Sequence, residues 1–122
     1  MIFSVFNNKE SRIKNFKEMA VKALDPYSRQ QDEGIDGIKE VIRRWREEGN
    51  DTCIREASAV FYDMASEYNE FFSKNLAIVD GHVKEKKPST IFDAVGSDIV
   101  EHYTRCIAMI SRAVEAFKME VG

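Results

Sequence analysis

The stretch DTCIREASAVFYDMASEYNEFFSKNLAIVD, residues 51–80, decides the fold. Its apolar side chains recur in steps of three and four over four heptads, which is the spacing of one face of an α-helix. Asp51 or Thr52 is a suitable N-terminal cap, and Asp80-Gly81 is a turn signal. We therefore expect a helix over about 51–79. Its apolar stripe consists of Ile54, Ala57, Phe61, Met64, Tyr68, Phe71, Asn75 and Ile78.

A second long helix is expected after the polar, lysine-rich turn HVKEKKP, residues 82–88. Ser89-Thr90 caps it, and the same spacing continues to about residue 120. Further apolar residues flank the stripe on both sides, so this helix should contact more than one neighbour. The stripe consists of Phe92, Val95, Ile99, Tyr103, Cys106, Ile110, Ala113 and Phe117.

Two shorter helices are expected before residue 51. The first runs over about 8–24 and ends at Asp25-Pro26, because the residue before proline is disfavoured in a helix. The second lies within DEGIDGIKEVIRRWREEGN, residues 32–50, and ends at Gly49-Asn50. The stripes are Ile13, Phe16, Ala20 and Ala23 in the first helix, and Ile35, Ile38, Ile42 and Trp45 in the second.

No run of alternating β-branched residues predicts a strand. A chain of 122 residues is large enough for one core and too short for two. We therefore expect a single all-α domain over residues 1–122. Its predicted architecture is an antiparallel four-helix bundle, with two short N-terminal helices and a long C-terminal helical hairpin.

The charge balance supplies no general attraction to nucleic acid, because 18 basic and 21 acidic residues leave a net charge of −3. The charge is uneven: residues 1–24 carry five positive and two negative side chains, and residues 49–80 carry two positive and six negative. The opening MIFSVF lacks the basic start of a secretory signal, and no apolar run approaches a membrane span. We expect a cytoplasmic protein in which Cys53 and Cys106 are reduced thiols.

The segment EHYTRC, residues 101–106, places six polar chemistries side by side. Helical geometry spreads them around the axis, with Tyr103 and Cys106 toward the core and Arg105 on the outer face. Cys106 and His102 are four apart and can touch, but no oxyanion hole or glycine-rich turn lies nearby in the sequence. We therefore expect a non-enzymatic protein in which His102 is a packed side chain.

Metal or cofactor binding has no positive support, since neither His82 nor His102 follows a glutamate by three residues, as di-metal bundles require. The expectation is therefore no cofactor. An alternative is a small carrier holding a ligand, haem or metal between the helices, near His102, Tyr103 and Cys106.

RNA binding is a weaker alternative, and it would use two basic groups. One is Arg43-Arg44-Trp45-Arg46, in which Glu40, Glu47 and Glu48 are spaced to neutralise the arginines. The other consists of Lys84, Lys86 and Lys87.

Helix lengths give the strongest indication of function. Two helices of roughly 17 residues span ~25 Å, whereas two of about 30 span ~45 Å. If the second helix folds back along 51–67, the connection 25–31 lies level with Tyr68, and residues 68–99 have no cover from the same chain. An alternative is that MIFSVF or a bent last helix closes the gap.

The uncovered half of the long hairpin is rich in large apolar side chains, and a contiguous apolar patch is unusual on a soluble monomer. We expect a protein-binding bundle, such as an adaptor, chaperone, inhibitor or immunity-like regulator, that acts through the hairpin tip and is homodimeric. The predicted partner-binding residues are Tyr68, Phe71, Phe72, Leu76, Val79, Ile91, Phe92 and Val95. The small residues Ala59, Ser66 and Ser73, spaced by seven, would also let a further helix approach.

Overall fold

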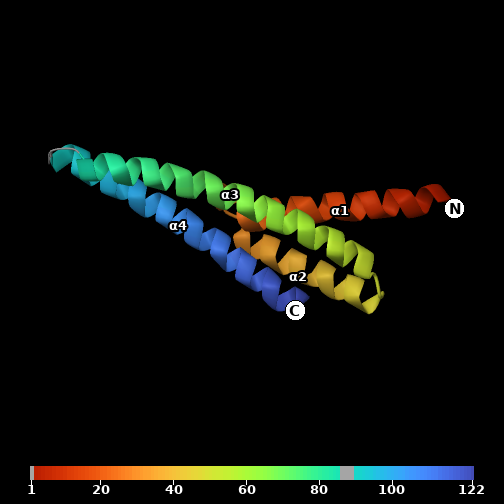
Figure 1. Cartoon of the computed structure of the whole chain (residues 1–122). Helices are drawn as coiled ribbons and strands as arrows, with labels where there is room; N and C mark the ends of the chain where they lie inside the picture. Colours follow the sequence, from red (N-terminus) through yellow and green to blue (C-terminus); the bar gives the residue numbers. More distant parts are fainter. Residues whose placement is uncertain (1, 86–89) are drawn as a thin grey trace.

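Residues 2–85 and 90–122 form four α-helices and one short 3-10 helix (Figure 1). The computed structural model describes residues 2–85 and 90–122, with side chains for residues 9–82 and 95–122. No strand occurs among these residues, so the prediction of an all-α four-helix bundle is confirmed. The elements are α1 (Ile2–Leu24), η1 (Pro26–Ser28), α2 (Gln31–Glu47), α3 (Asp51–Glu85) and α4 (Thr90–Val121).

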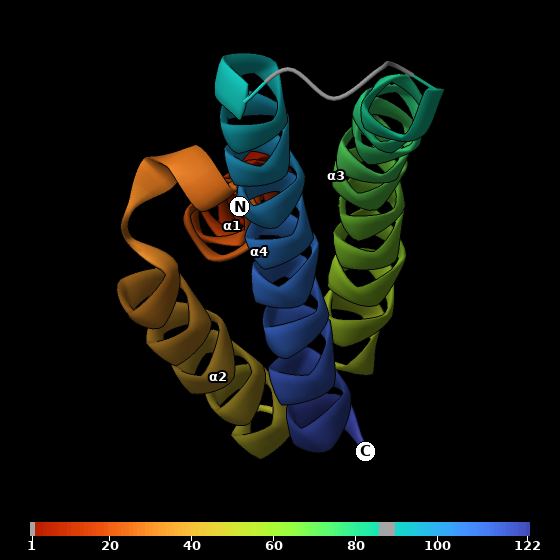
Figure 2. The ribbon, with the colours of Figure 1, turned by 90° about the vertical axis from the view of Figure 1, so that its left-hand side faces the viewer.

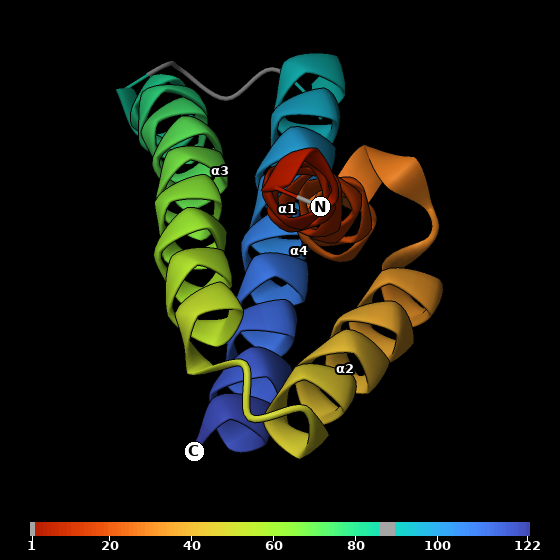
Figure 3. The same ribbon diagram turned by 90° about the vertical axis from the view of Figure 1, so that its right-hand side faces the viewer.

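The four helices pair as two antiparallel hairpins, α1 with α2 and α3 with α4. The hairpins meet so that α1 packs on α3 and α2 packs on α4. Figures 2 and 3 show α2 and α3 on opposite sides, with α1 and α4 between them. The expectation that the second helix folds back along residues 51–67 is therefore wrong about its neighbour, because α2 packs mainly against α1 and α4.

A glycine brings the backbones of α1 and α2 close together. A Cβ atom built on Gly34 would lie 2.4 Å from the backbone nitrogen of Ala23 and 2.8 Å from the carbonyl oxygen of Met19. No real side chain tolerates these distances, so only glycine fits here. The helix-weakening effect of Gly34, roughly 1 kcal/mol relative to alanine, is outweighed by the close packing that it permits.

The buried side chain of Gln31 joins three helices. Its Nε2 donates to the carbonyl oxygens of Ala23 in α1, at 3.0 Å, and Met109 in α4, at 2.6 Å. Its Oε1 accepts from Arg112 at 2.9 Å, and Arg112 also pairs with Asp32 at 2.6 Å. These bonds satisfy a buried amide and hold the start of α2 against α4.

An aromatic residue from each helix forms the centre of the core. The rings of Phe61 (α3) and Phe117 (α4) stack with centroids 4.2 Å apart and planes 9° apart. Phe16 (α1) packs edge-on against both, and Trp45 (α2) lies 6.1 Å from Phe16. All four side chains are at most 3% exposed. The core therefore lies in the half of the hairpin that α1 and α2 cover.

Three predicted boundaries differ from the observed ones. The first helix begins at Ile2 and not near residue 8. Asn50, rather than Asp51 or Thr52, caps α3, since its Oδ1 accepts from the backbone N–H of Cys53 at 3.2 Å. The long helix also runs through Asp80-Gly81 to Glu85, because one glycine inside a helix costs only about 1 kcal/mol.

The long hairpin extends well past the short helices. α2 has 17 residues and α4 has 32, which correspond to about 25 and 48 Å. Figure 1 shows α3 and α4 continuing beyond η1, while the start of α1 points the opposite way. We call residues 71–85 and 90–101 the tip, and residues 51–70 and 102–121 the basal half.

Candidate protein-binding surface

A single stripe of α3 passes from the core to the surface. Ala57, Met64, Phe71 and Ile78 are spaced by seven and therefore lie on nearly the same side of the helix. Ala57 is fully buried and Met64 packs against the core. Phe71 is 57% exposed and Ile78 is 52% exposed. The apolar pattern thus continues after the neighbouring helices of the same chain have ended.

The same change occurs along α4. Val95 and Ile99 lie on the helix face that also carries Cys106 and Ile110. Cys106 and Ile110 are each 2% exposed, whereas Val95 is 53% and Ile99 is 37% exposed. Both helices of the tip therefore present the continuation of their core-facing stripe to solvent.

Phe72 is a correction to the predicted surface. It is 2% exposed and belongs to the core, where its ring lies 5.8 Å from Tyr27 and 6.0 Å from Tyr103. The cause is η1, which packs against α4 and brings the Tyr27 ring over Phe72 of α3. The expectation that this connection lies level with Tyr68 is confirmed, because Tyr27 and Tyr68 line one pocket.

The other predicted residues fall into three groups. Phe71 and Val95 are exposed on the tip. Tyr68, Leu76 and Val79 are partly buried, and Tyr68 packs against the core. The side chains of Ile91 and Phe92 lie outside the described residues. Among the described side chains, Ile78 and Ile99 are also exposed on the tip; they belong to the uncovered half but not to the predicted binding residues.

A shallow pocket of about 520 Å³ lies where η1 meets the tip. Its lining combines aromatic side chains with two carboxylates, and the pKa of the Tyr68 phenol is raised by burial and then by the negative charges of Asp25 and Glu67. Sequence reasoning missed this pocket, although Asp25-Pro26 signalled the turn that forms it. The lining residues are Asp25, Tyr27, Met64, Glu67, Tyr68, Phe71 and Phe72.

His102 lies behind this pocket as a packed side chain. Its Nε2 is 2.9 Å from the Tyr27 hydroxyl and 3.7 Å from the Cys106 sulfur, and its ring stacks on Tyr27. Burial raises the pKa of the Cys106 thiol, which disfavours the thiolate that nucleophilic chemistry requires. The Thr104 hydroxyl instead donates to the Val100 carbonyl. Within the EHYTRC segment, His102 and Cys106 therefore meet each other, whereas Thr104 bonds to the backbone of its own helix.

The described part of the chain contains no group of three or more His, Cys, Asp and Glu side chains placed to hold a metal. Both cysteines are free and buried. No helix within residues 2–85 and 90–122 is long and apolar enough to span a membrane.

The arginines of α2 are paired, mostly across the bundle. Arg43 and Arg46 both bind Glu120 of α4, with N–O distances of 3.0 and 3.6 Å. Arg44 pairs with Glu40 at 3.1 Å, as its spacing predicted. Glu48 instead binds Arg12 of α1 at 2.9 Å. The arginines are paired with carboxylates, as expected, but Arg43 and Arg46 pair with Glu120, which is distant in the sequence.

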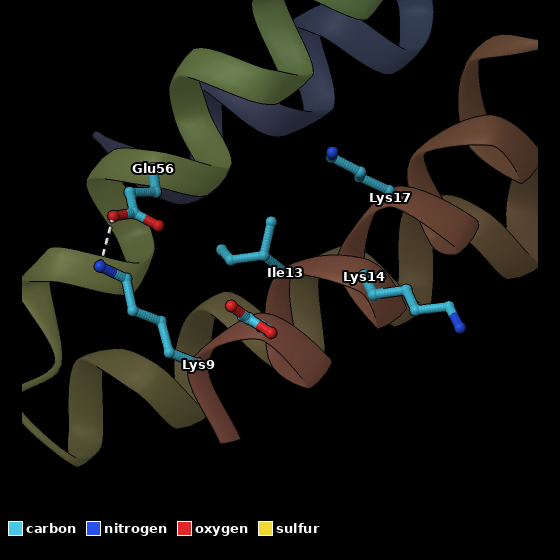
Figure 4. Close-up of a pocket in the computed structure, with 6 residues that line it drawn as sticks. Lys9, Ile13, Lys14, Lys17 and Glu56 are labelled. Atoms are coloured by element: carbon cyan, nitrogen blue, oxygen red, sulfur yellow. Dashed lines mark ion pairs between the residues drawn. The ribbon is translucent and has the colours of Figure 1, made fainter. Parts of the chain in front are cut away.

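The uneven charge along the sequence is partly balanced inside the bundle, because basic α1 lies beside acidic α3. Figure 4 shows the groove between them, in which Lys9 reaches across to Glu56 at 2.6 Å. This ion pair raises the pKa of Lys9. Lys14 and Lys17 point in different directions in the same view, so the groove does not gather its lysines around one anion.

One of the three small residues of α3 that are spaced by seven lines a groove of about 380 Å³ between α3 and α4. Ser66 lines it together with Ala65 and Ser111, whereas Ala59 and Ser73 do not.

No protein family model, curated protein or solved structure matches the chain.

Proposed function

We propose that this chain is a non-enzymatic, cytoplasmic protein-binding bundle that acts through its hairpin tip, and that the tip binds a second copy of the chain. One observation carries the proposal: apolar stripes that are at most 2% exposed at Ala57 and Cys106 become 37–57% exposed at Phe71, Ile78, Val95 and Ile99. Burying a large apolar side chain contributes roughly 1.5–3 kcal/mol, so covering these side chains on two copies offers a substantial gain.

A second copy is the occupant that fits best. In the basal half, the same stripes of α3 and α4 are covered by a pair of helices from the same chain. A second tip supplies two helices with the same apolar spacing, and a two-fold axis between the tips completes a four-helix arrangement. Two buried free cysteines fit a reducing compartment.

Sedimentation equilibrium of purified protein tests this proposal. We expect twice the chain mass at micromolar concentration, and the chain mass for an Ile78→Asp, Val95→Asp variant with unchanged helix content. Met119→Asp is the matched control, because Met119 is 84% exposed but lies at the other end of α4. A wild-type chain that remains monomeric, or a control that dissociates as fully as the tip variant, contradicts the proposal.

A further inference from the structure

The pocket beside η1 contains two carboxylates, Asp25 and Glu67. Among the side chains of residues 9–82 and 95–122, no lysine, arginine or histidine forms an ion pair with either of them. One Asp25 oxygen accepts the backbone N–H of Tyr27 at 2.9 Å, which fixes this carboxylate at the start of η1. Both charges reach the Tyr68 phenol, whose pKa is raised by burial and then by Asp25 and Glu67. The pocket therefore has a negative potential, which favours a positively charged occupant.

Aromatic rings form much of the pocket wall. Tyr27 is 58% exposed and Phe71 is 57% exposed, whereas Phe72 is buried and lies deeper. The ring planes of Phe71 and Phe72 are 87° apart, and those of Tyr27 and Phe72 are 54° apart. Rings at such large angles can contact one occupant from different sides. The face of an aromatic ring is negative and attracts a cation, so the rings and the carboxylates favour the same kind of ligand.

The pocket has few groups that could hydrogen-bond a cation. The Tyr27 hydroxyl already lies 2.9 Å from Nε2 of His102, and Met64, Phe71 and Phe72 have no side-chain oxygen or nitrogen. A primary ammonium or a guanidinium has several N–H groups that must find new partners when they leave water. A quaternary ammonium has no N–H group, and its charge is spread over its alkyl groups. Aromatic rings with nearby carboxylates therefore suit a quaternary ammonium best.

We propose that this pocket binds a small quaternary alkylammonium compound, whose alkyl groups contact the aromatic rings and whose charge lies beside the two carboxylates. The volume of about 520 Å³ is in the range of small-molecule sites. All the lining residues belong to one chain, so this site goes beyond the proposed homodimer and does not depend on it. Because the pocket is shallow, we expect a dissociation constant on the order of 1–10 mM for a small cation.

Choline and its neutral isostere test the preference for charge. The isostere is the alcohol in which a tert-butyl group replaces the trimethylammonium group, so it keeps the shape and lacks the charge. Two-dimensional NMR of the labelled wild-type chain measures both dissociation constants. Choline should cause saturable shifts in amides of residues 25–28 and 64–72, and the isostere should bind at least about tenfold more weakly. An isostere that binds as tightly as choline, or choline shifts that do not saturate, overturns the proposal.

Two variants test the parts of the site separately. Glu67→Gln should raise the choline dissociation constant about threefold, because it removes one exposed charge. Glu70→Gln is the matched control, since Glu70 is exposed on the same helix and does not line the pocket. Phe71→Leu stays apolar but lacks the ring, so it should weaken choline about threefold and leave the isostere nearly unchanged. Equal weakening by Glu67→Gln and Glu70→Gln, or a Phe71→Leu chain that weakens both compounds alike, contradicts the assignment. A monomeric wild-type chain that passes these tests keeps the cation site and overturns only the homodimer.

Discussion

The basal half and the tip of the long hairpin have the same apolar pattern and opposite surroundings. In the basal half, Phe61 and Phe117 are at most 1% exposed because α1 and α2 lie over them. In the tip, Phe71 continues the stripe of Ala57 and Val95 continues that of Cys106, and both are more than half exposed. The difference shows that burial follows the length of the covering helices and not the local sequence alone.

Replacing one phenylalanine in each half should show this difference most strongly. Phe61→Ala removes a fully buried ring stacked on Phe117 and should lower the free energy of unfolding by about 4 kcal/mol. Phe71→Ala should lower it by less than about 1 kcal/mol, because the ring is mostly exposed. Urea unfolding in the Ile78→Asp background measures both on the isolated chain. Similar losses at the two positions would contradict the contrast between the halves.

Adding one methyl group in each half gives the next largest effect. Gly34→Ala forces a Cβ against the backbone of α1 and should cost about 3 kcal/mol, at the upper end for overpacked sites. Gly81→Ala meets nothing within 4 Å and should stabilise α3 by up to about 1 kcal/mol. Thermal melting of the two variants checks the opposite signs. A stabilised Gly34→Ala chain would show that α1 and α2 do not pack this closely.

Gln31→Ala should have a moderate effect, about 2 kcal/mol, because it deprives Arg112 and two backbone carbonyls of a buried partner. The loss should fall on the basal half, where Gln31 joins α1, α2 and α4. Chemical denaturation measures the loss in the free energy of unfolding, and amide hydrogen exchange shows which residues are destabilised. Exchange that rises in the tip and not at the start of α2 would disagree with this assignment.

Alkaline pH should weaken the packing around Tyr27, Tyr68 and Cys106, where the basal half meets the tip. We expect this effect to be smaller than those of the three sets of substitutions above. Burial raises the pKa of Tyr27 and Tyr68 above 10.0 and that of Cys106 above 9.0. The folded chain holds these protons more tightly than the unfolded chain does. The protonated groups therefore stabilise the fold fully below their unfolded pKa values, and this stabilisation is lost as the pH rises through their folded pKa values. The melting temperature should therefore fall above about pH 9, and less steeply for Tyr27→Phe. An identical pH profile for that variant would contradict a role for Tyr27.

The sequence was sufficient for the helical architecture and for the short α2 beside the long α3 and α4, but α1, with 23 residues, is longer than the roughly 17 expected. The stripes of α3 and α4 have the period of one helical face over many turns, and Asp25-Pro26 must interrupt a helix. These are local signals, so the end of α1 at Leu24 and the span of α4 were predicted closely.

Contacts between distant parts of the sequence escaped prediction. Phe72 was expected on the surface, because nothing local shows that Tyr27 folds over it. The need for glycine at position 34 has no local signal, since only its neighbour Ala23 in α1 shows why a side chain does not fit there. The position of α2 beside α4 depends on Gln31 and Glu120, which have no sequence signature.

Hydrogen exchange as a function of protein concentration tests the central claim most directly. If a second copy covers the tip, amides in residues 73–85 and 90–101 should exchange more slowly as concentration rises through the dimer dissociation constant. In the basal half, the exchange rates of amides such as those of residues 57–65 should change little with protein concentration, unless these amides exchange only through global unfolding. Tip protection that does not depend on concentration, in a chain that stays monomeric, would contradict the account.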